Sequence, residues 1–111
     1  MVAAESLFHQ TGFRWSVVRV RWLAAAAQGR RDQLEYVAKR NAQAAIDIGD
    51  KLRAATRLLG RHPLIGRAGR RAGTREWVVA GTPFLIVYRV EDDIVTILRL
   101  FHGAQDRTAE D

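Results

Sequence analysis

Arginine and histidine are the residue types with the most distinctive chemistry in this sequence. The chain has 111 residues and 18 cationic side chains, of which only Lys39 and Lys51 are lysine. A guanidinium group keeps its charge when buried, and its planar fork binds carboxylate or phosphate through two hydrogen bonds. Four residues in the last third of the chain could bind a phosphate, although no convincing acid–base pair accompanies them. These candidates are Arg75, Arg89, Arg99 and His102.

Metal and thiol chemistry find little support in the sequence. The chain has no cysteine, which excludes disulfides, a zinc ribbon, an iron–sulfur cluster and thiol catalysis. The histidines His9, His62 and His102 do not share the short helical spacing of a metal pair. The acidic run at 91–93 has side chains in alternating directions, which predicts a polar hairpin rather than a metal site. We therefore expect neither a metal nor a cofactor.

The charge balance predicts an acidic or polyanionic partner. Eighteen cations against 12 acidic residues give a formal net charge of +6, and the isoelectric point lies near 11.0. A surface of this kind suits nucleic acid or an acidic protein, and composition alone does not choose between them. A simpler interpretation is that the positive charge only keeps the protein soluble.

Length and composition predict one compact domain. Apolar residues make up 48% of the chain and charged residues 27%, which is enough to fill a core and to solvate a surface. No stretch approaches the roughly 18 uninterrupted apolar residues of a membrane span. The first residues also lack the basic start of a secretory signal. We expect a cytoplasmic protein, with an N-terminal extension of unknown order at 1–15 and a folded domain at 16–111.

Residues 16–60 show two kinds of hydrophobic periodicity. Apolar and charged side chains alternate from Ser16 to Trp22, as in a half-buried strand. From Leu23 to about Gly60, apolar residues recur at three- and four-residue steps, which predicts amphipathic helices. Asn41 is suited to cap a helix there, so we expect an antiparallel helical hairpin. Pro63 should end the second helix, because proline lacks an amide hydrogen and its predecessor avoids helical geometry.

The rest of the chain predicts a connector and three strands. Residues 61–75 hold five arginines, three glycines and no acidic residue, which indicates a basic, flexible connector. Strand patterns occur at 75–80, 84–90 and 94–101. The turns between these segments are of hairpin length, so the three strands should form an antiparallel meander. The order of an N-terminal strand, a helical hairpin and a three-stranded antiparallel meander predicts an α+β fold. In such a fold the helices cover one face of the sheet and leave the other face for a partner.

Alternation along the middle strand separates a core face from a second face. We interpret Tyr88 as a packed aromatic residue whose hydroxyl is satisfied at the rim of the core. We also interpret the three tryptophans as packed aromatic residues: Trp15, Trp22 and Trp77. An exposed Trp77 could instead stack on a nucleic-acid base. The predicted core face carries Phe84, Ile86, Tyr88 and Val90, and the second face carries Leu85, Val87 and Arg89.

The candidate site residues also have structural interpretations. Arg75 and Glu76 lie on opposite faces of a strand, so one of them should turn toward the helices, with an internal ion pair as the simplest role for Arg75. His102 at a strand end is more typical of a structural hydrogen-bonding residue than of an acid or base. The other connector arginines could form no more than a solvated loop: Arg67, Arg70 and Arg71.

Four segments, taken together and in order, resemble the RelE/ParE superfamily of toxins from type II toxin–antitoxin systems. They are LGRHPLIGR at 59–67, TREWVV at 74–79, PFLIVYRV at 83–90 and ILRLFHGAQ at 97–105. The resemblance covers about residues 16–107. Several linked motifs in the right order make it specific, and it implies the same α+β fold.

The superfamily divides by mechanism, and one position of this chain bears on the division. RelE-type members cut messenger RNA on the ribosome, which requires cations around the phosphate and groups that move protons. An arginine commonly precedes the family's apolar-Val-Tyr stretch, and Leu85 occupies that position here. Losing one well-placed cation typically costs a factor of about 100 or more, which weighs against an efficient nuclease. The segments at 83–84 and 102–105 look more like ParE, whose members poison DNA gyrase without cleavage chemistry.

The resemblance therefore favours a non-nucleolytic inhibitor of DNA gyrase. The alternative is a ribosome-dependent messenger RNA endonuclease, and a third option is a domain that keeps the fold as a binding or regulatory module. Toxins of this class are neutralised by a cognate antitoxin that wraps them and occupies the groove between helices and sheet. A +6 surface with apolar grooves suits an acidic amphipathic partner, so we expect a hetero-oligomer with such an antitoxin. The endonuclease alternative would use Arg75, Arg89, Arg99 and His102.

Overall fold

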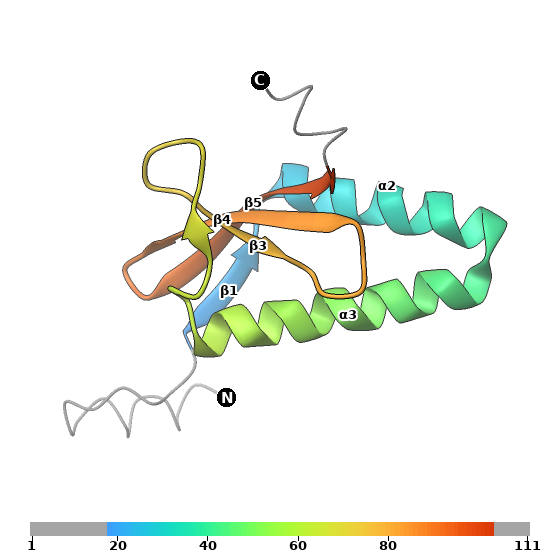
Figure 1. Cartoon of the computed structure of the whole chain (residues 1–111), viewed down its shortest axis with the longest axis horizontal. Coiled ribbons are helices and arrows are strands. Elements are labelled where there is room, and N and C mark those ends of the chain that lie inside the picture. The colour runs from blue at the N-terminus through green and yellow to red at the C-terminus, as the bar shows by residue number, and fades with distance from the viewer. Residues whose placement is uncertain (1–17, 104–111) are drawn as a thin grey trace.

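The computed structural model describes residues 18–103, which form two layers, a sheet and a helical hairpin that covers one face of it (Figure 1). The strand order is β1-β5-β4-β3-β2. β1 pairs with β5 in parallel, and the other neighbouring strands are antiparallel. The predicted α+β fold is therefore confirmed. Its elements are β1 (Arg19–Trp22), α2 (Ala24–Arg40), α3 (Ala42–Arg61), β2 (Arg67–Ala68), β3 (Arg75–Val78), β4 (Phe84–Glu91) and β5 (Ile94–His102).

The helical hairpin forms where the hydrophobic periodicity predicts it. α2 and α3 meet at Asn41, whose Oδ1 accepts a hydrogen bond from the Ala44 amide at 3.0 Å and so caps α3. α3 ends at Arg61, two residues before Pro63. The buried residues of α3 recur at helical spacing and form its inner side: Gly49, Leu52, Ala55, Leu59 and Gly60.

The three strands predicted for the last third form the meander β3-β4-β5. Asp92 and Asp93 join β4 to β5 with φ angles of 52° and 63°. These left-handed values are typical of a tight two-residue hairpin whose twist matches that of the strands, as predicted for this acidic run. β1 can lie parallel to β5 because the chain between them is long: it runs through the helical hairpin to β2 at the far edge of the sheet and returns through β3 and β4.

The connector between α3 and β3 is more ordered than predicted. Its residues Arg67 and Ala68 form β2, in which Arg67 lies opposite Glu76 of β3. The Gly69 amide donates to the Thr74 carbonyl at 2.8 Å and closes the loop that follows. The prediction of a flexible connector was therefore wrong, because its backbone groups find partners in the sheet and within its own turn.

The remaining differences concern the ends of strands. β1 begins at Arg19, and the expected start at Ser16 lies outside the described residues, as do Trp15 and the extension at 1–15. β3 ends at Val78 rather than at residue 80, because a turn begins there in which the Thr82 amide donates to the Val79 carbonyl at 3.1 Å.

The core lies between the helices and the predicted inner face of β4. Phe84, Ile86 and Tyr88 are 2%, 0% and 0% exposed, as expected for that face. Trp22 and Trp77 are partly buried and pack against the same cluster, which confirms their interpretation as core residues. The other members of the cluster come from both layers: Ala26, Leu52, Ala55, Leu59, Val79, Val95, Ile97 and Leu100.

Candidate functional site

We call the side of the sheet opposite the helices the open face. Strand pairing aligns Arg89 of β4 with Thr96 of β5, and Thr96 with Arg21 of β1, so these three side chains form one row across the sheet. The Arg21 Nε donates to the Thr96 hydroxyl at 3.1 Å. The open face carries Arg19, Glu76, Val78, Leu85, Val87, Arg99 and Phe101 in addition to this row.

Two of the four candidate residues lie on this face. Arg89 is partly exposed and pairs with Glu91 at 3.2 Å. Arg99 is exposed, and its guanidinium carbon lies 5.1 Å from the ring centroid of Phe101. The ring of Phe101 is only 4% exposed although it belongs to the open face. Both arginines thus hold defined positions on the cationic side of the sheet.

The other two candidates, Arg75 and His102, point to the helix side. Arg75 pairs with Tyr88 in the sheet and donates to the carbonyl oxygens of Leu64 at 3.2 Å and Gly66 at 2.8 Å. The internal ion pair expected for Arg75 was therefore wrong, because its partners are connector carbonyls. His102 pairs with Phe84, and the two rings meet edge to face at 5.5 Å.

The four candidate residues therefore do not converge on one point. Arg75 and His102 lie beside different parts of β4: Arg75 pairs with Tyr88 in the middle of the strand, and His102 pairs with Phe84 at its start. Tyr88 and Phe84 are four positions apart, which corresponds to about 13 Å along a strand. The Arg75 guanidinium is bound to the Leu64 and Gly66 carbonyls, whereas the His102 ring packs on Phe84, so the two side chains make their contacts at separate places.

The Tyr88 hydroxyl joins the connector to the sheet through two hydrogen bonds. It donates to the Pro63 carbonyl at 2.8 Å and accepts from the Gly66 amide at 2.9 Å. The side chain is fully buried, as predicted for a packed aromatic residue with a satisfied hydroxyl. Burial raises the pKa of this hydroxyl above its ordinary value of 10.0, while the Gly66 hydrogen bond and the charge of Arg75 act in the opposite direction.

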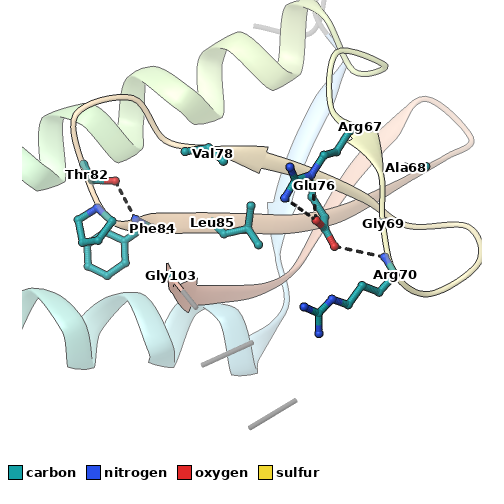
Figure 2. A pocket seen from close by; sticks show the side chains of 11 residues that line it. Arg67, Ala68, Gly69, Arg70, Glu76, Val78, Thr82, Phe84, Leu85 and Gly103 are labelled. Atoms are coloured by element: carbon teal, nitrogen blue, oxygen red, sulfur yellow. Dashed lines mark hydrogen bonds and ion pairs between the residues drawn. The ribbon is translucent and has the colours of Figure 1, made fainter. Parts of the chain in front are cut away.

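A pocket of about 550 Å³ opens between the connector and β4, and we call it the open-face pocket (Figure 2). Glu76 lies at one end and accepts from Arg67 at 3.1 Å and from the Arg70 amide at 3.2 Å. Figure 2 shows Leu85 and Val78 between this polar end and the end at Thr82 and Phe84. The pocket is lined by Arg67, Ala68, Gly69, Arg70, Glu76, Val78, Thr82, Pro83, Phe84, Leu85 and Gly103.

The importance of Glu76 was missed by the sequence analysis, although a signal exists. It is the one acidic residue between positions 61 and 90, inside a strongly basic stretch. Its side chain is 4% exposed, and a carboxylate is buried only where donors surround it. A single acid in a basic run therefore indicates an organising residue.

A second hollow, the helix-side groove, lies between β1 and the helical hairpin and has a volume of about 350 Å³. The guanidinium carbon of Arg30 lies 4.2 Å from the ring centroid of Trp22, and Arg53 forms an ion pair with Asp50. An aromatic ring and two cations thus line one groove, together with Leu34, Gly49, Leu52 and Thr56.

A family model described as the ParE toxin of type II toxin–antitoxin systems, parDE, matches residues 20–107. The chain belongs to this ParE toxin family. The match confirms the RelE/ParE resemblance, and it includes the whole sheet except one residue of β1. This ParE-family chain is thus the toxin component of a type II toxin–antitoxin system.

Comparison with individual proteins agrees with this family. "Putative toxin Y4kP" of Sinorhizobium fredii is 36% identical over 88 residues, which cover 78% of this chain and 90% of that protein. The chromosomal ParDE system of P. aeruginosa has the same fold, with a TM-score of 0.71 and 18% identity over 78% of this chain and 97% of that one. The toxin–antitoxin complex RelBE2 of Mycobacterium tuberculosis is less similar in structure, with a TM-score of 0.56, and is 24% identical, with 82% of this chain and 97% of that one covered.

Two further observations concern only residues 18–103 of the ParE-family toxin. Within this range, neither helix is sufficiently long and apolar to cross a bilayer. The same range contains no group of three or more His, Cys, Asp or Glu side chains placed to hold a metal ion.

Proposed function

We propose that this ParE-family toxin inhibits DNA gyrase without cutting nucleic acid and that a cognate antitoxin neutralises it in the cytoplasm. The family match supports the gyrase target over the ribosome. The proposal rests above all on the dispersal of the four candidate residues over both faces of the sheet. Arg89 and Arg99 lie on the open face, whereas Arg75 and His102 serve the connector and the core on the helix side.

This dispersal matters because phosphodiester cleavage needs convergent groups. A cation must sit at the developing charge, and an acid and a base must each reach a reacting oxygen. Leu85 occupies the position of the nuclease arginine and is 6% exposed on the open face. An apolar, buried side chain there supports a surface that binds a partner over one that cleaves a phosphodiester.

The helix-side groove suits the antitoxin. An acidic amphipathic segment could place carboxylates beside Arg30 and Arg53 and an apolar side chain against Trp22 and Leu34. The net charge of +6 would steer such a segment toward the toxin, and burial of its apolar side would slow release.

Expression of the toxin without an antitoxin is expected to arrest growth with gyrase-linked DNA breaks and intact transcripts. Purified toxin should inhibit supercoiling by purified gyrase in the absence of ribosomes. Codon-spaced cuts in translated messages would instead establish the endonuclease alternative. Normal growth after confirmed soluble expression would favour a binding or regulatory module.

The same assay addresses the open-face arginines. Arg89→Ala combined with Arg99→Ala should relieve growth arrest, while removal of such surface side chains should cost only about 0.5 kcal/mol of stability each. Arg31→Ala with Arg57→Ala is the matched control, because it removes two exposed arginines from the helices. Loss of cooperative unfolding in the variant with Arg89→Ala and Arg99→Ala would mean that these arginines support the fold.

Charge reversal in the helix-side groove should weaken antitoxin binding. Arg30→Glu with Arg53→Glu is expected to raise the dissociation constant by about tenfold or more, mainly through slower association, because carboxylates would then face carboxylates. The control is Arg31→Glu with Arg57→Glu, which makes the same change in net charge on the same helices. Titration calorimetry would measure the dissociation constant of the antitoxin, and stopped-flow measurements would give its association rate. An equal loss of antitoxin affinity in both double variants would contradict the proposed antitoxin site.

A further inference from the structure

We propose that the open-face pocket binds an acidic segment of the toxin's target protein and accepts one aliphatic side chain from it. This inference builds on the proposed function, since it assigns the target-binding surface of the same toxin. It concerns the side of the sheet opposite the helix-side groove, so target and antitoxin would use different surfaces.

The floor of the pocket is apolar. Val78 is 54% exposed, so its aliphatic side chain is accessible to a partner from the open face. Strand pairing places it directly opposite Leu85, and Pro83 and Gly103 complete this end. A volume of about 550 Å³ accommodates more than one side chain, so a protruding leucine or isoleucine together with its neighbours could enter.

The opposite end of the pocket is cationic. Arg67 and Arg70 line it, within a connector from 61 to 75 that holds five arginines and no acidic residue. Glu76 balances part of this charge, but its carboxylate is turned inward onto Arg67 and the Arg70 amide. The Arg67 side chain remains 68% exposed while it makes this pair, so its outer side faces solvent and favours an incoming carboxylate.

The pocket is built before any partner arrives. Glu76 fixes Arg67 and the turn at Arg70, while Tyr88 and Arg75 fix the backbone from Pro63 to Gly66. A preformed site loses little conformational freedom on binding, so more of the contact energy appears as affinity. Such preorganisation is expected of a recognition site more than of a solvated loop.

A peptide fits this surface better than a nucleic acid does. Sites for single-stranded nucleic acids usually offer exposed aromatic rings on which bases stack. Among residues 18–103, Phe84 is the one aromatic residue that lines the pocket, and it is 2% exposed with its ring in the core. An apolar floor beside arginines instead matches an aliphatic residue next to an acidic one.

The test compares Val78→Glu and Arg70→Glu with the control Ile46→Glu. Ile46 lies on α3 and is 57% exposed, so the control puts the same charge at an equally exposed aliphatic position outside the pocket. Each full-length chain is purified with its antitoxin, released from it, and titrated onto purified gyrase. We expect both pocket variants to bind at least about tenfold more weakly and to relieve growth arrest, while the control binds and arrests growth as the parent does.

Thermal unfolding and antitoxin affinity show whether each variant is folded, and both should match the parent for the pocket variants. Full toxicity of Val78→Glu would overturn the proposal. Loss of antitoxin binding with toxicity retained would overturn it too, because the antitoxin would then be the occupant. If only Arg70→Glu relieved growth arrest and it also lost affinity for a DNA duplex, nucleic acid would be the occupant and the proposal would fail.

The experiment tests the gyrase target and the role of the open-face pocket separately. If the parent arrests growth but does not bind gyrase, the target is a different molecule. The comparison of Val78→Glu with Ile46→Glu in growth arrest still decides whether the pocket contacts that target.

Discussion

Replacement of Gly66 by alanine is expected to lower the free energy of unfolding by about 2–4 kcal/mol, because it overpacks a buried site and disturbs a hydrogen bond there. A Cβ atom at this position would lie 2.6 Å from the Tyr88 hydroxyl oxygen and 2.8 Å from the Glu76 carbonyl oxygen. Neither neighbour can yield easily, since Tyr88 is fully buried and the Glu76 carbonyl is sheet backbone. The connector would have to move away from β3, which would break β2.

Gly73→Ala is the natural comparison for this prediction. Gly73 has a φ of 81°, but a Cβ atom there would have no neighbour within 4 Å among the described residues, so alanine would strain the backbone without a clash from them. That strain should cost about 1 kcal/mol. Urea titration of both variants separates the two effects, and equal losses would show that the contact around Gly66 relaxes at little cost.

The order of elements was predictable because it depends on local patterns. Three- and four-residue periodicity, a capping asparagine at position 41 and a proline at position 63 are sufficient to outline the helical hairpin. The acidic turn at 92–93 likewise indicates a hairpin without knowledge of the rest of the chain. These features lie within about 20 residues of the structure that they specify.

The arrangement of the site was not predictable in the same way. Alternation shows that Arg75 and Glu76 face opposite sides, but only the pairing of Arg75 with Tyr88 establishes that the arginine turns to the helices. β2 has two residues, too few to show any periodicity. It forms because Tyr88, 22 residues beyond Gly66, holds the connector against the sheet. Contacts of this range leave no local pattern in a single sequence.

Leu85 illustrates the same limit at the candidate site. Its place on the second face of β4 follows from alternation, and the pairing of β4 with β3 confirms it. Its burial does not follow, since a residue on a face left for a partner is expected to be exposed. The structure places Leu85 directly across from Phe101, and both are less than 7% exposed. The open face therefore combines an apolar centre with arginines around it.

Tyr88→Phe is expected to lower the free energy of unfolding by about 1–3 kcal/mol at neutral pH, because it leaves the buried Gly66 amide without its acceptor and the Pro63 carbonyl without its donor. The ring would stay in the core, so the change removes two hydrogen bonds and little packing. Urea titration at pH 7 measures this loss. Tyr36→Phe is the matched control, since Tyr36 is 57% exposed on α2 and its replacement should change stability by less than about 0.5 kcal/mol.

Alkaline titration gives Tyr88 a second, independent signature. Because burial raises the pKa of its hydroxyl in the folded chain, the folded state holds this proton more tightly than the unfolded state, whose pKa is near 10.0. The associated stability is fully present below pH 10 and is lost as pH rises through the folded-state pKa. Above pH 10, the free energy of unfolding of the parent should therefore fall more steeply than that of Tyr88→Phe. The difference in free energy of unfolding between the two proteins should narrow as pH rises. Tyr36→Phe should keep the steep alkaline loss of the parent; if it flattened the profile as much as Tyr88→Phe did, the buried hydroxyl would not be the titrating group.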